Sequence, residues 1–165
     1  MQFFVSRSQK NSNLFMFQPL GFEQRSIITS LGRMVYYTNG ANPWQKSEQK
    51  NIVKENLVFL HGFGGGSSAY EWSKVYPAFA DFYQVLAPDL IGWGSSEHPA
   101  RNYQVDDYLT TIREFLVSTC PEPVTVVASS LTAAFVIRVA CVHPELFKSL
   151  ILTTPVGLAD FGEDY

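Results

Sequence analysis

Short apolar runs alternate along this chain with stretches in which apolar residues recur every three or four positions. The short runs predict strands at residues 23–29, 33–38, 56–60, 83–87, 124–128 and 149–153. Apolar residues at helical spacing predict helices over 70–79, over 105–116 and after the strand at 124–128. The first two strands are expected to form an antiparallel hairpin. Because strands and helices then alternate, the pattern predicts an α/β fold with a mostly parallel sheet and helices on both faces.

Composition places the chain among globular proteins. Of its 165 residues, 46% are hydrophobic and 16% are charged, and the net charge is −3. This length predicts one domain at 21–165, preceded by a poorly ordered lead-in at 1–20. The charge argues against a nucleic-acid partner. No run approaches the roughly 18 apolar residues of a membrane span, and residues 1–20 lack the apolar core of a signal peptide, which favours a cytoplasmic location.

Two cysteines, Cys120 and Cys141, have neither the spacing of a metal site nor that of a disulfide framework. We therefore expect both to be reduced packing residues. No metal and no cofactor is predicted.

The stretch PVTVVASSLT, residues 123–132, begins as a β-branched run typical of a buried strand and continues into a predicted helix. A strand, a sharp turn with serine at its apex and a helix form a nucleophile elbow. Such a turn needs small residues two positions before and after the nucleophile. Ser130 has Ala128 and Thr132 there, whereas Ser129 would have two larger aliphatic residues. Ser130 is therefore the candidate nucleophile, and the alternative is an ordinary helix N-cap.

Three loops follow predicted parallel strands: the glycine-rich loop at 61–66, the loop at 89–96 and the turn at 129–131. Ligands of open parallel sheets bind outside the carboxyl ends of the strands. The three loops are thus expected to converge on one site for a small-molecule substrate.

These motifs, in this order, resemble the α/β-hydrolase superfamily over residues 22–157. LVFLHGFGG at 57–65 is similar to the family's third strand and oxyanion loop, and APDLIGWGSS at 87–96 to the loop after its fourth strand. ASSLT falls at the family's elbow, with both usual glycines replaced. The resemblance implies an incomplete α/β-hydrolase fold that holds strands 1–6 and lacks strands 7–8 and the cap.

The resemblance also implies the site residues. Ser130 would be the nucleophile, and the backbone N–H groups of Phe63 and Leu131 would form the oxyanion hole. Structural roles in the loops are implied for His61, Gly62 and Asp89. A serine rather than an aspartate at the elbow implies acyl transfer from an ester-type small molecule or lipid, instead of dehalogenase or epoxide-hydrolase chemistry.

The catalytic acid and histidine that should follow the serine are not found. The only later histidine, His143, lies thirteen positions beyond Ser130, at the far end of a predicted helix. At 1.5 Å per residue it is about 18–20 Å away, whereas a base must come within about 3 Å. His98 is expected to be a solvated loop residue.

We therefore expect this chain alone to be inactive. Three interpretations remain open: a truncated serine hydrolase, one chain of a split hydrolase, or a non-catalytic binding module. The partner would accordingly be a complementing C-terminal half, or the chain would associate with itself.

Overall fold

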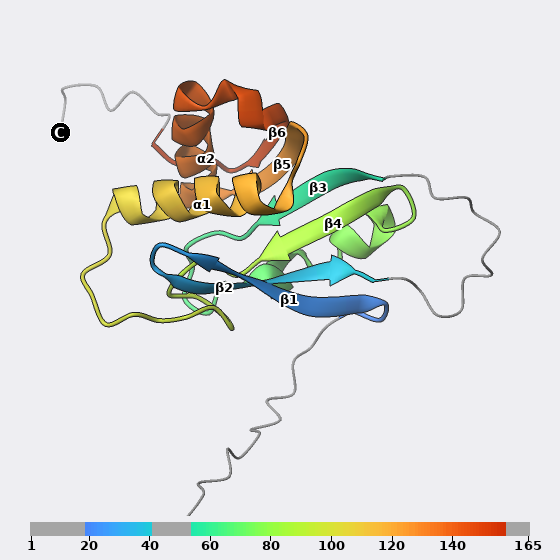
Figure 1. Cartoon of the computed structure of the whole chain (residues 1–165), viewed down its shortest axis with the longest axis horizontal. Helices are drawn as coiled ribbons and strands as arrows, with labels where there is room; N and C mark the ends of the chain where they lie inside the picture. Colours follow the sequence, from blue (N-terminus) through green and yellow to red (C-terminus); the bar gives the residue numbers. More distant parts are fainter. Residues whose placement is uncertain (1–18, 41–53, 158–165) are drawn as a thin grey trace, which may run out of the picture.

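The structure, a computed structural model, describes residues 19–40 and 54–157, so the predicted lead-in lies almost wholly outside it. In the described part, six strands form one sheet in the order β1-β2-β4-β3-β5-β6 (Figure 1). The strands are β1 Phe22–Thr29, β2 Gly32–Asn39, β3 Glu55–Leu60, β4 Tyr83–Pro88, β5 Val124–Ser129 and β6 Phe147–Thr153. β1 and β2 form an antiparallel hairpin, β2 pairs antiparallel with β4, and the other pairs are parallel. The predicted strands and the mostly parallel sheet are confirmed.

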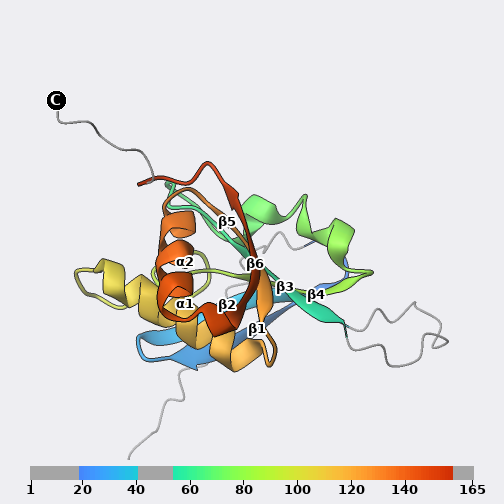
Figure 2. The same cartoon turned by 90° about the horizontal axis from the view of Figure 1, so that it is seen from above.

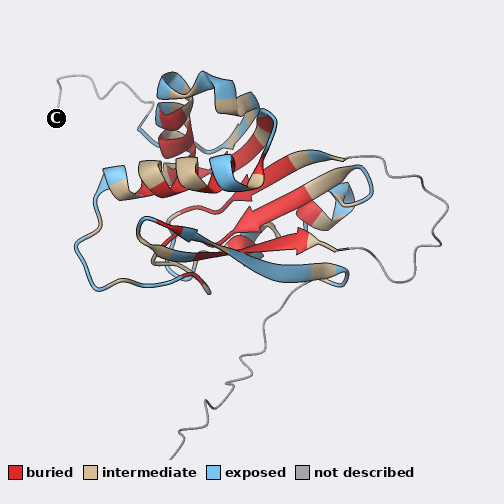
Figure 3. Ribbon diagram, viewed as in Figure 1, coloured by how far each residue is buried: buried red, intermediate tan, exposed pale blue. Residues whose placement is uncertain are grey.

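Two helices, α1 Val105–Thr119 and α2 Ser130–Val142, cover one face of this sheet. Figure 2 shows them on one side and two short helical segments on the other. The core between these helices and the sheet contains Phe115 and Val136 from the helices and Val58, Leu86 and Val126 from the strands. On the opposite face it contains Val35, Phe59, Ala69, Tyr76 and Val85. Both faces of the central strands are buried, as their continuous apolar runs predict (Figure 3).

The helix predicted over 70–79 is wrong as an element. Two 3-10 helices, η1 Ala69–Trp72 and η2 Tyr76–Phe79, stand in its place. A continuous α-helix would need the N–H of residue 77 to donate to the carbonyl of residue 73, and Pro77 has no N–H. Trp72 and Tyr76 still pack against the sheet, so the apolar spacing identified the buried face correctly.

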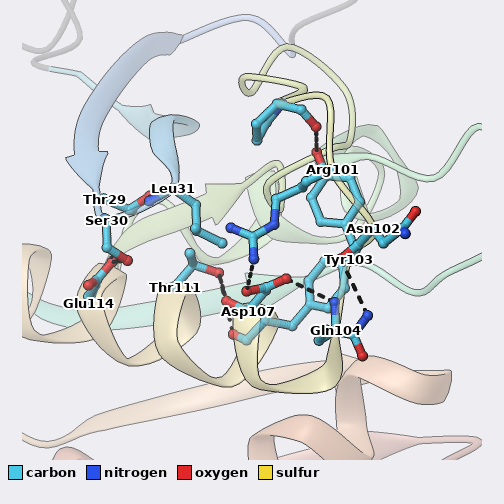
Figure 4. Close-up of polar contacts among 12 residues, drawn as sticks. Thr29, Ser30, Leu31, Arg101, Asn102, Tyr103, Gln104, Asp107, Thr111 and Glu114 are labelled. Carbon is cyan, nitrogen blue, oxygen red and sulfur yellow. Dashed lines mark hydrogen bonds and ion pairs between the residues drawn. The ribbon is translucent and has the colours of Figure 1, made fainter.

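Helix α1 is joined to the β1–β2 turn and to its own leading loop by side-chain contacts (Figure 4). The Glu114 carboxylate accepts hydrogen bonds from the Ser30 N–H at 2.9 Å and the Ser30 hydroxyl at 3.1 Å. The Asp107 carboxylate accepts the Gln104 N–H and an Arg101 N–H, both at 2.9 Å. An acidic first turn also suits the positive end of the helix dipole. These contacts fix α1 relative to the β1–β2 turn and to the loop that precedes the helix.

Across the described residues, no helix has the length and apolar character needed to cross a membrane. The same residues contain no group of three or more His, Cys, Asp or Glu side chains that could hold a metal ion. Both cysteines are free; Cys120 is buried as expected, but Cys141 is exposed near the end of α2. The packing role predicted for Cys141 is therefore wrong, because its position on α2 faces away from the core.

Candidate active site

The junction of β5 and α2 forms a sharp turn at Ser130. Ser129, the last residue of β5, is extended with φ −118° and ψ 153°, whereas Ser130, the first residue of α2, has φ 54°. A positive φ at a residue with a Cβ is uncommon and costs about 1–3 kcal/mol. The turn leaves the Ser130 side chain half-buried. Within the described residues, its hydroxyl makes no hydrogen bond.

The glycine-rich loop after β3 lies directly against this turn. A Cβ at Gly62 would be 3.1 Å from the Ser129 Oγ and 3.4 Å from the Ser130 Cβ. A glycine therefore allows the loop and the turn to approach this closely. The carboxyl ends of β3 and β5 bring together two of the three loops that the sequence predicted to meet.

His61 is buried and held through both ring nitrogens. Its Nε2 accepts the Leu90 N–H at 3.0 Å, so the proton is on Nδ1, which donates to the Gly62 carbonyl at 2.7 Å. Burial lowers the pKa of His61 below its ordinary value, while the Gly62 carbonyl and the charges of Asp89 and Glu71 act in the opposite direction. His61 is thus a neutral side chain with no nitrogen left to serve Ser130.

The His61 hydrogen bond also orients the peptide unit between Gly62 and Phe63. In a trans peptide the C=O and N–H point in opposite directions, and this peptide is trans. Since the Gly62 carbonyl points at the imidazole, the Phe63 N–H points away from it. The Phe63 ring is fixed by edge contacts to Trp93, Tyr108 and Phe135, with centroids 4.8–5.3 Å apart.

Two backbone N–H groups, one in the glycine-rich loop and one directly after Ser130, are left without acceptors in the described part of the chain. The Phe63 N–H makes no backbone or side-chain hydrogen bond there. The Leu131 N–H lies in the first turn of α2, where a helix supplies no acceptor of its own. Free N–H groups at a helix N-terminus and an adjoining loop can stabilise a developing oxyanion.

The Asp89 side chain holds the loop after β4 through hydrogen bonds. It is buried, and its Oδ1 accepts the Ala69 N–H while its Oδ2 accepts the Ser95 N–H, both at 2.7 Å. Its own N–H donates to the Val35 carbonyl at 2.9 Å. Asp89 therefore joins β2, η1 and the loop after β4, which are the contacts that a bracing residue requires.

The remaining histidines do not contact Ser130. His143 directly follows α2, at the far end of the helix from Ser130 as the helix length predicted. Its Nδ1 lies 3.3 Å from a Glu145 carboxylate oxygen. His98 is exposed, with Nε2 3.3 Å from the Gly94 carbonyl. The sequence has three histidines, so this chain places no histidine on the Ser130 hydroxyl.

Sequence reasoning missed three hydrogen bonds at this site. The Thr132 hydroxyl, where the family usually has glycine, is fully buried and donates to the His61 carbonyl at 2.6 Å. The Glu71 carboxylate accepts hydrogen bonds from Gly62 and Ser129. The hydrogen bonds from Ser129 and Thr132 join residues 58 and 71 positions apart, so no local spacing could have revealed them.

Comparison with known proteins agrees with this geometry. A family described as the alpha/beta hydrolase fold matches residues 55–163. This chain belongs to the α/β-hydrolase family. The six-stranded, mostly parallel sheet is thus a part of the α/β-hydrolase fold, and the predicted fold is confirmed.

Relatives within the family differ in their chemistry. The chain is 34% identical over 111 residues to the probable lysophospholipase BODYGUARD 1 of Arabidopsis thaliana, covering 64% of this chain and 24% of that protein. It is 31% identical over 110 residues to a soluble epoxide hydrolase of Corynebacterium sp., covering 66% and 38%.

A solved serine hydrolase involved in carbazole degradation has a similar fold. It superposes with a TM-score of 0.71 at 24% identity, covering 84% of this chain and 50% of that one. The chain thus spans half or less of the length of each of these α/β hydrolases.

Proposed function

We propose that Ser130 is the nucleophile of a serine hydrolase that acts on an ester-type small molecule or lipid by acyl transfer. The observation that carries this proposal is the positive φ of 54° at Ser130, at the junction of β5 and α2. Backbone strain of this kind persists where surrounding contacts hold it, and it presents the side chain at the apex of the turn. An ordinary helix N-cap needs no such strain, because N-cap residues adopt extended backbone angles.

The proposed reaction begins with attack of the Ser130 oxygen on the substrate carbonyl carbon. The carbonyl π electrons move to its oxygen, and the N–H groups of Phe63 and Leu131 donate hydrogen bonds to the resulting oxyanion. One such donor contributes about 10²–10³-fold to the rate in a serine protease. The serine proton passes to a base. The oxyanion then re-forms the carbonyl as the bond between the acyl carbon and the alkoxy oxygen breaks, and that oxygen takes the proton from the base and leaves as the alcohol. Water then hydrolyses the acyl-serine.

The identity of the nucleophile favours acyl carbon over alkyl carbon as the point of attack. A carboxylate that opens an epoxide forms an ester, which water can hydrolyse. A serine that attacked the same carbon would form an ether, which water does not cleave under these conditions. Ser130 attacking an acyl carbon forms an ester and so allows turnover.

A histidine base would have to come from outside this chain, because none of its three histidines contacts Ser130. A longer polypeptide or a second, complementing chain would supply the histidine and its acid. The same observation favours a second candidate, a non-catalytic binding module that keeps the loops without the chemistry.

Chemical rescue tests the first proposal against the second. Imidazole at high concentration supplies a diffusible base, and a fluorophosphonate traps an activated serine covalently. We expect imidazole-dependent labelling of Ser130, located by mass spectrometry, which Ser130→Ala abolishes and Ser118→Ala on the exposed face of α1 leaves unchanged. A folded chain that shows no label at Ser130 would favour the binding module.

A further inference from the structure

The carboxylate of Glu71 lies between the glycine-rich loop and the elbow and contacts both. Its Oε2 accepts the Gly62 N–H at 3.0 Å, and its Oε1 accepts the Ser129 hydroxyl at 2.6 Å. Ser129 is buried and directly precedes Ser130. Glu71 itself is an exposed residue in the first turn of η1, nine positions after Gly62.

A solvated glutamate near a helix start is the ordinary interpretation of such a position. The two hydrogen bonds argue against it. Each oxygen takes a separate donor, and the two donors belong to different loops of the proposed site. Hydrogen bonds to an ionised carboxylate are stronger than those between neutral groups, so this pair ties the two loops together.

The peptide unit between His61 and Gly62 is consequently held at both ends. Its C=O accepts the Thr132 hydroxyl from α2 at 2.6 Å, and its N–H donates to Glu71 from η1 at 3.0 Å. The next peptide unit is held by the His61 imidazole. With both units fixed, the Phe63 N–H has a defined direction. The Gly62 N–H is occupied by Glu71, so the Phe63 N–H is the first N–H after it in this loop with no acceptor in the described residues.

We propose that Glu71 is a positioning residue of the hydrolase site, whose carboxylate clamps the oxyanion loop to the nucleophile elbow and so fixes the Phe63 N–H relative to the Ser130 oxygen. This proposal rests on the proposed function of Ser130. The clamp itself can be measured without any chemistry at Ser130.

Amide hydrogen exchange of the whole chain tests the clamp directly. Glu71→Ala removes both acceptors, and we expect the Gly62 amide to exchange at least tenfold faster. The Leu90 amide, which donates to His61 and does not contact Glu71, should also accelerate if the loop moves. Amides of Val58 and Val126 in the central strands serve as internal references. Glu122→Ala, at an exposed glutamate in the turn before β5, is the matched control.

Glu71→Gln separates position from charge. Glutamine can still accept from Gly62 through its oxygen and donate to the Ser129 hydroxyl through its nitrogen, since a hydroxyl both donates and accepts. We expect this variant to keep Gly62 exchange and the imidazole-dependent labelling rate of Ser130 within about threefold of the parent, whereas Glu71→Ala lowers the labelling rate at least tenfold.

Two results would overturn the clamp. One is unchanged exchange at Gly62 and Leu90 in Glu71→Ala; the other is a glutamine variant that keeps Gly62 exchange slow yet is labelled at Ser130 as slowly as the alanine variant, which would assign the labelling effect to charge rather than position. If the parent chain is never labelled at Ser130 but Glu71→Ala still releases Gly62 and Leu90, the clamp stands and the nucleophile assignment fails.

Discussion

Gly94 shows how tightly single residues are constrained in the loop after β4. Its φ is 51°, and a Cβ there would lie 2.2 Å from the Asp89 Oδ2. Asp89 cannot move aside, because it is buried and its carboxylate oxygens accept the N–H groups of Ala69 and Ser95. Any side chain at Gly94 would therefore break contacts that join the loop to η1.

We expect Gly94→Ala to lower the free energy of unfolding, measured by urea titration. The loss should be no smaller than the cost of one strained backbone residue, about 1–3 kcal/mol. Gly65→Ala is the matched control, since nothing lies within 4 Å of a Cβ at Gly65. The control should remain within about 0.5 kcal/mol of the parent. Equal destabilisation by both variants would contradict the bracing role of Asp89.

The buried imidazole of His61 links stability to pH. Burial lowers its pKa in the folded chain below the ordinary value of 6.5. As pH falls through about 6.5, the unfolded chain binds a proton at this position before the folded chain does. The contribution of the neutral His61 imidazole to folding stability is complete above about pH 6.5 and declines below it. In a protonated ring, Nε2 would also carry a hydrogen and could no longer accept the Leu90 N–H, so this hydrogen bond would be lost.

We therefore expect the urea concentration at the unfolding midpoint to decrease as the pH is lowered from 7.5 to 5.5. His61→Gln should be less stable at pH 7.5 but lose less stability on acidification, because the titrating group is gone. His98→Gln, at an exposed histidine, should keep the full pH dependence of the parent. An unchanged slope in His61→Gln would show that other groups cause the acid sensitivity.

Among the elements, the two edge strands differ in how they are protected. β1 carries Glu23 and Arg25 within the strand, and such charges discourage pairing with another chain. β6 pairs only with β5 in the described structure, and its residues Leu150, Ile151, Leu152 and Thr153 include no charge or proline. Its one charged residue, Lys148, stands near its start and pairs with Glu55.

We expect this edge to make the isolated chain associate with itself, with an apparent mass that rises with concentration in size-exclusion chromatography with light scattering. Ile151→Lys should reduce the association. Ile28→Lys on β1, the opposite edge strand, is the matched control. Both side chains are exposed, Ile28 by 77% and Ile151 by 52%, so each variant adds a lysine at an exposed isoleucine. A soluble monomer with a cooperative urea transition would instead mean that β6 is protected by other means, and would favour the binding module.

At the scale of the whole molecule, the carboxyl end of the sheet carries the proposed nucleophile and the proposed oxyanion donors without a histidine base. Loss of one member of a complete triad still leaves about 10³–10⁴-fold acceleration over water, but only while the remaining geometry is held. Here the contacts of His61, Glu71 and Thr132 hold the glycine-rich loop. Proton transfer therefore limits the proposed reaction.

We accordingly expect little or no hydrolysis of a chromogenic short-chain ester by this chain alone. The rate with Ser130→Ala should equal the parent rate within error. Robust parent activity that Ser130→Ala abolishes would reveal a base that these contacts do not show.

The apolar pattern by itself determined the strands, the parallel sheet and the place of the elbow. Strand and turn preferences depend on neighbouring residues, and parallel strands necessarily bring their carboxyl ends to one edge. For that reason the run before Ser130 and the small residues at Ala128 and Thr132 were enough to locate the turn. Family resemblance then assigned chemistry to Ser130.

Tertiary structure alone decided how the two loops at that edge are held. The hydrogen bonds of Ser129 with Glu71 and of Thr132 with His61 join residues 58 and 71 positions apart. Their formation depends on side-chain directions and on burial of the partners, which no local pattern encodes. The break between η1 and η2 had a local cause in Pro77, but only packing against the sheet shows that Trp72 and Tyr76 keep one buried face across it.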